Sequence, residues 1–264
     1  MKISIITPVL DAAGTVERAV RSVLDQEDPD FEHVVVDGGS TDGTLEVLRR
    51  YPNLVLLQRP GSGQAEAMNA GFEAATGEVV SYLNADDSYE PGAFRKVRRR
   101  FAEDPAVTFL VGRLRVEEDG RPERIAVPNL DFENMLRFFD RDFIPLNPSC
   151  YFYRREVQEL VGGYDVRRPY AMDYKFLLEA ALRFAFTRTD AVLGCYRIHR
   201  GTKTGRTSSD AESWRKARFS RGYRRHLPWR KRMLADVWYL TEGHYLGRRL
   251  LGRVAGKVRR WLRY

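Results

Sequence analysis

The sequence predicts an α/β fold with a mostly parallel central sheet flanked by helices, followed by a basic helical C-terminal extension. Strand-like apolar runs and amphipathic helical runs alternate along residues 1–83, in the order β-α-β-α-β-α-β. This order builds a parallel sheet through right-handed crossovers. Hydrophobic residues fill 43% of the 264 positions, which is enough for a large buried core.

Four short strands and three helices make up the first part of the chain. The expected strands cover residues 2–7, 31–36, 54–58 and 79–83, and the expected helices cover residues 15–25, 45–50 and 65–75. In the first helix, apolar residues from Val16 to Leu24 recur at steps of three and four, which places them on one face.

The second part mixes strands of a different kind with further helices. A helix over residues 92–100 precedes a β-hairpin formed by residues 107–116 and 125–127, which we expect beside the parallel sheet. The remaining expected elements are a short helix over 131–139, a strand over 150–153, a helix that begins near Ala171 and a last strand over 192–198.

The net charge of +8 is unevenly distributed along the chain. Residues 201–264 hold 18 Lys/Arg against 4 Asp/Glu, whereas residues 1–200 hold 26 against 32. We expect helices around 211–225, after Pro228 and around 245–263, the last with Leu and Trp between arginines. Such a helix suits an anionic membrane surface, and the alternative is packing on the rest of the chain or on a second copy in a homodimer. Nucleic acid is not expected as a partner, because the larger part is acidic.

Cysteine use and the N-terminal residues indicate a cytoplasmic protein. Cys150 and Cys195 form neither a disulfide framework nor a metal-binding spacing. Met1 and Lys2 lead directly into a strand, so we expect no signal peptide, and no apolar run is long enough to span a bilayer. With a membrane-binding extension, the expected location is the inner face of the cell membrane.

Polar side chains follow three of the expected parallel strands, at Thr7, at Asp37 and at residues 84–87. The carboxyl ends of parallel strands meet at one edge of a sheet, where α/β proteins bind their ligands. Asp86 and Asp87 repel each other there unless a divalent cation, which also binds phosphate oxygens, lies between them. An ordinary polar turn is the alternative interpretation. The chain contains neither a Gly-x-Gly-x-x-Gly dinucleotide motif nor a P-loop.

Four motifs occur in order along this first part: IITPVL at residues 5–10, VVDGGSTDGT at 35–44, GQAEAMNAGF at 63–72 and LNADD at 83–87. The weaker motifs GGYD, MD and YRIH follow at residues 162–165, 172–173 and 196–199. Together they resemble the family 2 inverting glycosyltransferases with the GT-A fold. The resemblance implies a catalytic domain over 1–205, with a nucleotide-sugar-binding half (1–100) and an acceptor half (101–205), and leaves 206–264 as the extension.

The resemblance also assigns a donor site, with a UDP-sugar favoured as the donor. It implies that Thr7 and Pro8 lie against the nucleotide base with Val9 beside them, and that Asp37 accepts a hydrogen bond from that base. It further assigns to the nucleotide-sugar pocket Gln64, Glu66, Asn69 and Asn84, although Asn69 alternatively only orders a loop. Asn84 stands where the family often has Asp.

The resemblance places Mn²⁺ or Mg²⁺ between the protein and the donor diphosphate. Asp87 is expected as the direct metal ligand, and Asp86 as a contact to the ribose or the metal. His199 is expected to ligate the metal or touch a phosphate, although a lone histidine is more often structural. Arg200 and Lys203 would add positive charge against the diphosphate.

A carboxylate at Asp173 matches the family's catalytic base. Inversion in one displacement needs a single base that faces the anomeric carbon opposite the leaving diphosphate. By itself Asp173 would read as an acid at a helix start, where the helix dipole stabilises its charge. Asp165 is the second candidate, and alternatively closes a turn or contacts acceptor hydroxyls. The acceptor is expected to be a hydroxyl of a glycan or a lipid-linked sugar.

Two other classes of function compete with glycosyl transfer. A sugar-phosphate nucleotidyltransferase also uses an α/β nucleotide fold and a metal, but it would carry a basic Gly-rich loop where residues 8–14 hold no basic residue. A membrane-surface or nucleic-acid binding module driven by the extension would leave the ordered motifs unexplained.

Overall fold

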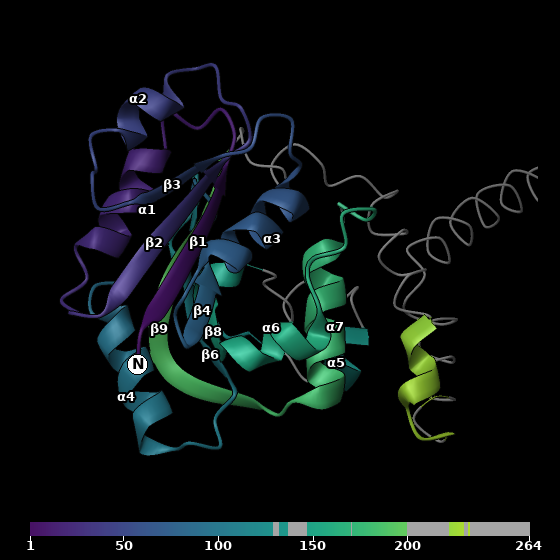
Figure 1. Cartoon of the computed structure of the whole chain (residues 1–264). Helices are drawn as coiled ribbons and strands as arrows, with labels where there is room; N and C mark the ends of the chain where they lie inside the picture. The colour runs from purple at the N-terminus through teal and green to yellow at the C-terminus, as the bar shows by residue number, and fades with distance from the viewer. Residues whose placement is uncertain (129–131, 137–146, 170, 200–221, 230–231, 233–264) are drawn as a thin grey trace, which may run out of the picture.

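A curled, nine-stranded mixed sheet forms the centre of the protein (Figure 1). The computed structural model describes residues 1–128, 132–136, 147–169, 171–199, 222–229 and 232. The strand order is β3-β2-β1-β4-β8-β6-β9-β5, and β7 pairs with β6 outside this path. The helices expected in the extension lie largely outside the described residues.

The first four strands run parallel, as the sequence predicts. They are β1 (Ile3–Val9), β2 (Phe31–Asp37), β3 (Val55–Gln58) and β4 (Val79–Tyr82). Ile3 pairs with Phe31 on one side and with Val79 on the other, so β1 lies between β2 and β4. Three helices connect these strands: α1 (Val16–Leu24), α2 (Thr44–Leu48) and α3 (Gln64–Ala74).

The second part of the sheet is mainly antiparallel. Its strands are β5 (Ser88–Tyr89), β6 (Phe109–Glu118), β7 (Arg124–Ala126), β8 (Tyr151–Arg154) and β9 (Phe186–Ile198). The expected hairpin is confirmed as the β6–β7 pair. Strand β8 joins the two parts by pairing antiparallel with both β4 and β6, whereas β9 runs parallel to β6. The last strand begins at Phe186, six residues before the predicted start, and the sequence analysis did not predict β5.

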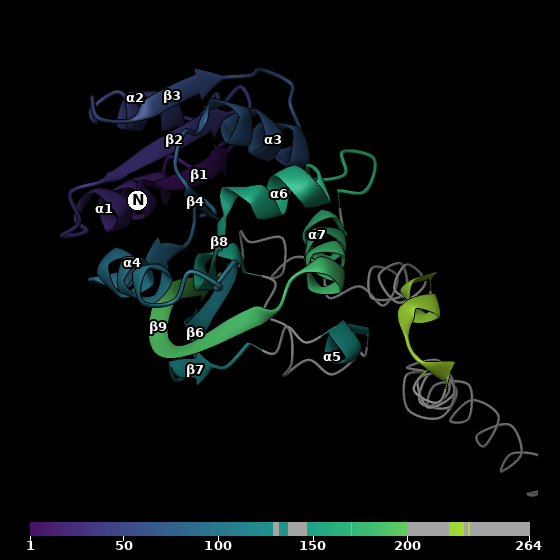
Figure 2. The same ribbon diagram turned by 60° about the horizontal axis from the view of Figure 1, so that its bottom comes forward.

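Helices cover both faces of the sheet (Figure 2). The remaining helical elements are α4 (Ala93–Glu103), α5 (Phe132–Leu136), α6 (Arg155–Val161), α7 (Met172–Arg183) and the 3₁₀ turns η1 (Pro148–Cys150) and η2 (Arg224–His226). One face packs Ile3 and Ile5 against α1 and α4. The opposite face packs Ile6 in one cluster with residues of α3, α6 and α7. Alternate residues of β1 therefore supply both cores.

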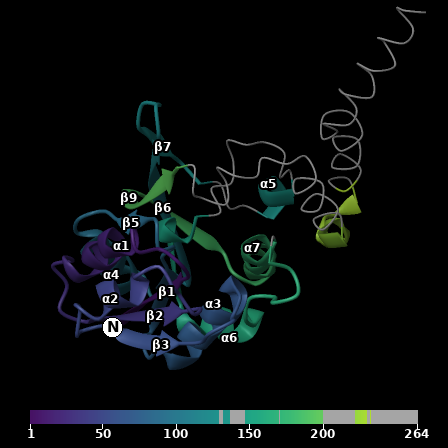
Figure 3. The ribbon, with the colours of Figure 1, turned by 90° about the horizontal axis from the view of Figure 1, so that it is seen from above.

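The long strand β9 runs back beside β5, which follows the loop after β4 (Figure 3). Cys195 of β9 pairs with Ser88, which directly follows the Asp86–Asp87 pair. This pairing explains how residues separated by more than one hundred positions come to share the edge of the sheet where the parallel strands end.

The backbone of β9 at Gly194 packs closely against Ser149 of η1. A Cβ atom built at this position would lie 2.3 Å from the Ser149 hydroxyl oxygen and 2.5 Å from its carbonyl oxygen. We predict that Gly194→Ala destabilises the protein by about 1–3 kcal/mol, since the backbone of η1 would have to move. Denaturant unfolding monitored by circular dichroism measures the change.

Gly14→Ala is the control, because a Cβ there meets nothing within 4 Å and its backbone has no positive φ. Its free energy of unfolding should stay within about 0.5 kcal/mol of the wild-type value. Equal stability of the two variants would contradict the packing described between β9 and η1.

Candidate active site

A buried carboxylate, Asp87, lies at the centre of the loop that follows β4. Its side chain is fully buried, and its two oxygens accept three hydrogen bonds. Asn84 Nδ2 and Asn147 Nδ2 donate to Oδ2 over 2.9 and 2.6 Å, and the Arg197 backbone amide donates to Oδ1 over 3.0 Å. We call Asp87 and these three donors the Asp87 network. It joins the loop after β4, the loop before η1 and the end of β9.

Burial raises the pKa of the Asp87 carboxyl, and the adjacent negative charge of Asp86 raises it further. The three donors oppose this rise, because a hydrogen bond to a carboxylate favours its ionised form. The turn itself is closed by the Asp87 amide, which donates to the Asn84 carbonyl oxygen over 3.1 Å. The loop is therefore both a turn and a cluster of side chains around one acid.

The neighbouring acid, Asp86, faces His199. The Asp86 Oδ2 and His199 Nε2 atoms lie 3.7 Å apart, and both side chains keep somewhat more than a quarter of their surface exposed to solvent. Carboxylate oxygen and imidazole nitrogen are both ligands of divalent metals. This partly exposed pair therefore carries metal-binding chemistry at the sheet edge, with the His199 Nε2 atom itself buried.

The hydrogen bonds of Asp87 give it a structural role, and its expected role as a direct metal ligand stays a prediction. A direct metal ligand needs an accessible oxygen, whereas donors occupy both Asp87 oxygens and no part of the side chain reaches solvent. Asp86 is better placed to meet a metal, and Asp87 anchors the turn that presents it.

The other predicted donor-site residues differ in whether they lie beside the loop after β4 or serve another part of the structure. Gln64 joins the loop after β4, where its Nε2 lies 3.4 Å from Asn84 Oδ1. Glu66 instead caps its own helix, since its carboxylate accepts a hydrogen bond from the Gly63 amide over 2.7 Å. Pro8 is half-buried and Val9 is buried, where the Val9 carbonyl accepts a hydrogen bond from the Gly38 amide over 2.9 Å.

The side chains of two other predicted donor-site residues, Thr7 and Asp37, make contacts within the protein itself. The fully buried Thr7 hydroxyl lies 2.8 Å from His33 Nε2, so this hydroxyl faces the protein interior and not the ligand-binding edge. The Asp37 carboxylate accepts hydrogen bonds from the amides of Gly39 and Ser40 over 2.9 and 3.1 Å, which is the loop cap expected as the alternative. A bond from Asp37 to a base stays a prediction.

Asn69 links α3 to the loop that precedes α7. Its Nδ2 donates to the Tyr164 carbonyl over 2.9 Å, and its Oδ1 accepts from the Tyr164 amide over 2.7 Å. Gly163 permits this approach, because a Cβ there would lie 2.8 Å from Asn69 Oδ1. The interpretation that Asn69 orders a loop is therefore the one that its contacts support.

Three aromatic rings in series connect the end of β4 with α7. The Tyr82 and Tyr164 rings meet edge to face with centroids 5.2 Å apart, and Tyr164 stacks on Phe176 at 5.0 Å. Tyr82 lies two residues before Asn84, and Phe176 lies one helical turn after Asp173. These rings fix α7 relative to the donor side of the sheet.

Asp173 occupies the first turn of α7, where the helix dipole stabilises a carboxylate. Two buried phenols, Tyr151 and Tyr164, lie close enough to feel its charge. Burial raises the pKa of both phenols, and the negative charge of Asp173 adds to the rise. Asp173 is thus a half-buried acid beside tyrosine side chains.

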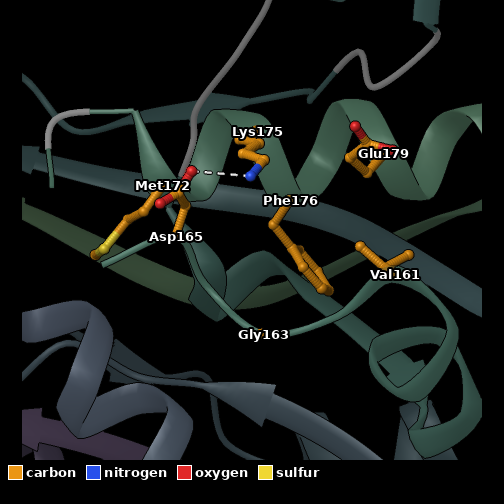
Figure 4. A pocket seen from close by; sticks show the side chains of 7 residues that line it. All are labelled: Val161, Gly163, Asp165, Met172, Lys175, Phe176 and Glu179. Atoms are coloured by element: carbon orange, nitrogen blue, oxygen red, sulfur yellow. Dashed lines mark hydrogen bonds and ion pairs between the residues drawn. The ribbon is translucent and has the colours of Figure 1, made fainter. Parts of the chain in front are cut away.

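Asp165, the second candidate for a base, is engaged in ion pairs. Lys175 Nζ lies 2.9 Å from Asp165 Oδ2, and the Arg167 and Arg168 guanidinium groups lie within 3.5 Å of the same carboxylate. The hydrogen bond from Lys175 lowers the pKa of Asp165, which makes it a weak base. Figure 4 shows this ion pair at a pocket formed by the end of α6, the loop at Gly163 and α7.

Part of the C-terminal extension contacts α7. The Tyr223 hydroxyl donates to Glu179 Oε1 over 2.6 Å, and Leu227 packs against the larger core cluster. Arg200 and Lys203 lie outside the described residues. Within the described part of the chain, no helix is both long enough and apolar enough to cross a bilayer.

The sequence analysis missed Asn147 and the Arg197 backbone amide as parts of the site. Residues 145–149 read as a loop with no chemical signal. The one available signal is Asn147-Pro148-Ser149, which is a helix-capping pattern. Asn147 does cap η1, since its Oδ1 accepts a hydrogen bond from the Ser149 amide over 3.0 Å.

Comparison with known proteins agrees with this geometry. Residues 4–161 match the model of the family described as glycosyl transferase family 2. The PGL/p-HBAD biosynthesis glycosyltransferase of Mycobacterium tuberculosis (strain ATCC 25618 / H37Rv) is 31% identical over 179 residues, which cover 66% of this chain and 67% of that protein. The chain belongs to glycosyl transferase family 2, and it is a glycosyltransferase.

Solved structures show the same fold. Staphylococcus aureus TarS 1-349 in complex with UDP-GlcNAc aligns with a TM-score of 0.64 at 20% identity, over 85% of this chain and 66% of that chain. The mannosyltransferase PcManGT from Pyrobaculum calidifontis, in complex with GDP-Man and Mn²⁺, aligns with a TM-score of 0.55 at 21% identity, over 96% of this chain and 79% of that chain. The GT-A fold expected from the sequence is confirmed.

The different positions of Asp86 and Asp87 predict different effects on stability. We expect Asp87→Asn to lower the free energy of unfolding by about 1–3 kcal/mol, because the new amide group must face buried N–H donors. Asp86→Asn should change it by about 0.5 kcal/mol or less, since this side chain is partly exposed. Urea unfolding of the two isosteric variants measures the difference. A stability loss confined to Asp86→Asn would reverse the assignment.

Proposed function

We propose that this enzyme is a metal-dependent inverting glycosyltransferase, which moves a sugar from a nucleoside diphosphate sugar to a hydroxyl of a glycan or lipid-linked acceptor. The observation that carries the proposal is the Asp86–His199 pair, with 3.7 Å between Oδ2 and Nε2, at the edge where the parallel strands end. That edge is where ligands bind in open α/β sheets.

The residues present fit a divalent cation that is shared with the donor. Among the described residues, no set of three His, Cys, Asp or Glu side chains could hold a metal alone. Asp86 and His199 would supply two ligands, and diphosphate oxygens and water would supply the others, as is usual for Mg²⁺ at nucleotide sites. Mn²⁺ or Mg²⁺ bound there would neutralise the charge that develops on the leaving diphosphate.

Asp173 would act as the general base. Its carboxylate takes the proton from the acceptor hydroxyl, the hydroxyl oxygen bonds to the anomeric carbon, and the bond from that carbon to the diphosphate oxygen breaks. Attack from the side opposite the leaving group inverts the anomeric configuration. The fixed position of α7 against Tyr164, through the stacked Phe176 ring, supports this role.

Support for a UDP-sugar donor comes from the similar fold of TarS in its complex with UDP-GlcNAc, and the PcManGT complex with GDP-Man and Mn²⁺ supports both a metal and a nucleotide sugar. Membership of a glycosyl transferase family disfavours the nucleotidyltransferase alternative, because that reaction makes the sugar nucleotide instead of using it.

We also propose that the extension (206–264) holds the enzyme on an anionic membrane surface, on the inner face of the cell membrane, where a lipid-linked acceptor would be available. Its charge supports this proposal, with 18 Lys/Arg against 4 Asp/Glu in residues 201–264. The alternative is that the extension packs on the rest of the chain. The contact of Tyr223 with α7 supports this alternative for that short segment alone. Homodimer formation stays a prediction.

The assignment of Asp173 predicts a catalytic loss without a binding loss. Asp173→Asn should lower the rate of transfer by a factor of about 10²–10⁴, since the amide cannot accept the proton. The affinity for the nucleotide sugar, measured by calorimetry, should be unchanged. Normal turnover by this variant would show that Asp173 only begins α7.

Metal removal and product stereochemistry test the reaction itself. We expect EDTA to abolish transfer by the wild-type enzyme and Mn²⁺ to restore it, because Asp86 and His199 would bind the donor diphosphate only through the cation.

Proton NMR of the glycoside formed from a panel of UDP-, GDP- and dTDP-sugars should show an inverted anomeric configuration. Full activity in excess EDTA, or retention of configuration, would overturn the proposed mechanism.

Membrane association is tested by co-sedimentation of the full chain with phosphatidylglycerol vesicles and with neutral phosphatidylcholine vesicles. Binding should be confined to the anionic vesicles and should weaken as salt is raised, because cationic side chains near the surface carry it. Absence of binding to anionic vesicles at moderate salt would contradict the proposal.

A further inference from the structure

We propose that Asn147, a residue of the acceptor half, is a positioning residue for the metal-binding pair Asp86 and His199, and that it acts through Asp87. This inference rests on the proposed function, in which that pair binds the cation. Asn147 is 6% exposed and its Nδ2 donates to Asp87 Oδ2, so it acts through Asp87 on the residues proposed to reach the metal.

The orientation of the Asn147 amide is set by its own turn. Its Oδ1 accepts hydrogen bonds from the Ser149 amide over 3.0 Å and from the Ser149 hydroxyl over 2.6 Å. With the oxygen held by these two donors, the Nδ2 group must point the other way, toward Asp87 Oδ2 at 2.6 Å. The amide cannot flip without breaking all three bonds.

Asp87 passes this constraint to both predicted metal ligands. Its backbone directly follows Asp86, and its Oδ1 accepts a hydrogen bond over 3.0 Å from the amide of Arg197, two residues before His199. One carboxylate thus fixes the turn that carries one ligand and the strand end that carries the other. Partners behind metal ligands orient the ligands and tune metal affinity.

Asn147 also makes the shortest contact to Asp87. Its Nδ2 donates over 2.6 Å, against 2.9 Å from Asn84 and 3.0 Å from the Arg197 amide. A buried carboxylate is costly unless donors surround it. Loss of this donor would weaken the connection between the loop before η1 and the loop after β4.

Asn147→Asp isolates this role. The substituted side chain has the same size and still caps η1 through an oxygen that accepts from the Ser149 amide. The group that faces Asp87 changes from a donor to a carboxylate oxygen, which repels it. We expect the Mn²⁺ concentration for half-maximal binding of UDP, measured by calorimetry and by the EPR signal of free Mn²⁺, to rise by about 10–100-fold.

Gln26→Glu is the matched control. Gln26 is also 6% exposed, and its Nε2 donates to the carbonyl oxygens of Ser22 and Glu90 over 2.9 and 3.0 Å, while its Oε1 accepts from the Phe94 amide. The control therefore loses a buried amide donor and gains a negative charge, as Asn147→Asp does, but at the packing of α1 against α4. It should lower the melting temperature and leave the Mn²⁺ dependence of UDP binding unchanged.

Equal Mn²⁺ affinity of wild type and Asn147→Asp, or an equal loss in both variants, would overturn the positioning role. If Asn147→Asp does not fold, Asn147→Ala removes the donor without adding charge and should show a weaker loss of the same kind. A wild-type enzyme that binds UDP without any Mn²⁺ dependence would instead refute the proposed metal site, and the positioning role with it.

Discussion

One buried carboxylate links three parts of the chain at the edge of the sheet where the parallel strands end. Asp87 draws hydrogen bonds from its own turn, from the loop before η1 and from the end of β9. Burying a carboxylate is costly unless donors surround it, so the donors from these three segments offset the cost of burying Asp87. Strand pairing between β4 and β8 and between β5 and β9 brings these segments together, and Asp87 adds hydrogen bonds that link the turn of Asp86 to the strand end that precedes His199.

The first half of the fold could be predicted from the sequence because its signals are local. Apolar runs that end in polar residues mark β1, β2 and β4, and the periodicity from Val16 to Leu24 marks α1. Parallel strands joined by helices have few possible arrangements, so the shared edge followed from the element order. The same reasoning placed the Asp86–Asp87 loop correctly at that edge.

The second half and the fine division of roles could not be predicted in this way. Asn147 reaches Asp87 because β8 pairs antiparallel with β4, and no local pattern contains that pairing. Asp86 and Asp87 are chemically identical neighbours, and tertiary donors decide which of them turns inward. The carboxylates of Asp37 and Glu66 are of a kind that often contacts ligands, but here they accept hydrogen bonds from backbone amides and so cap a loop and a helix.

We propose that Asp86 and His199 bind a divalent cation because Asp87 holds them in place. Pulsed EPR of Mn²⁺ bound to the wild-type enzyme with UDP tests this claim most directly, since a coordinated imidazole couples its nitrogen to the metal electrons. We expect a ¹⁴N coupling in the wild-type enzyme that is absent from His199→Gln. A wild-type spectrum without histidine nitrogen coupling would contradict it.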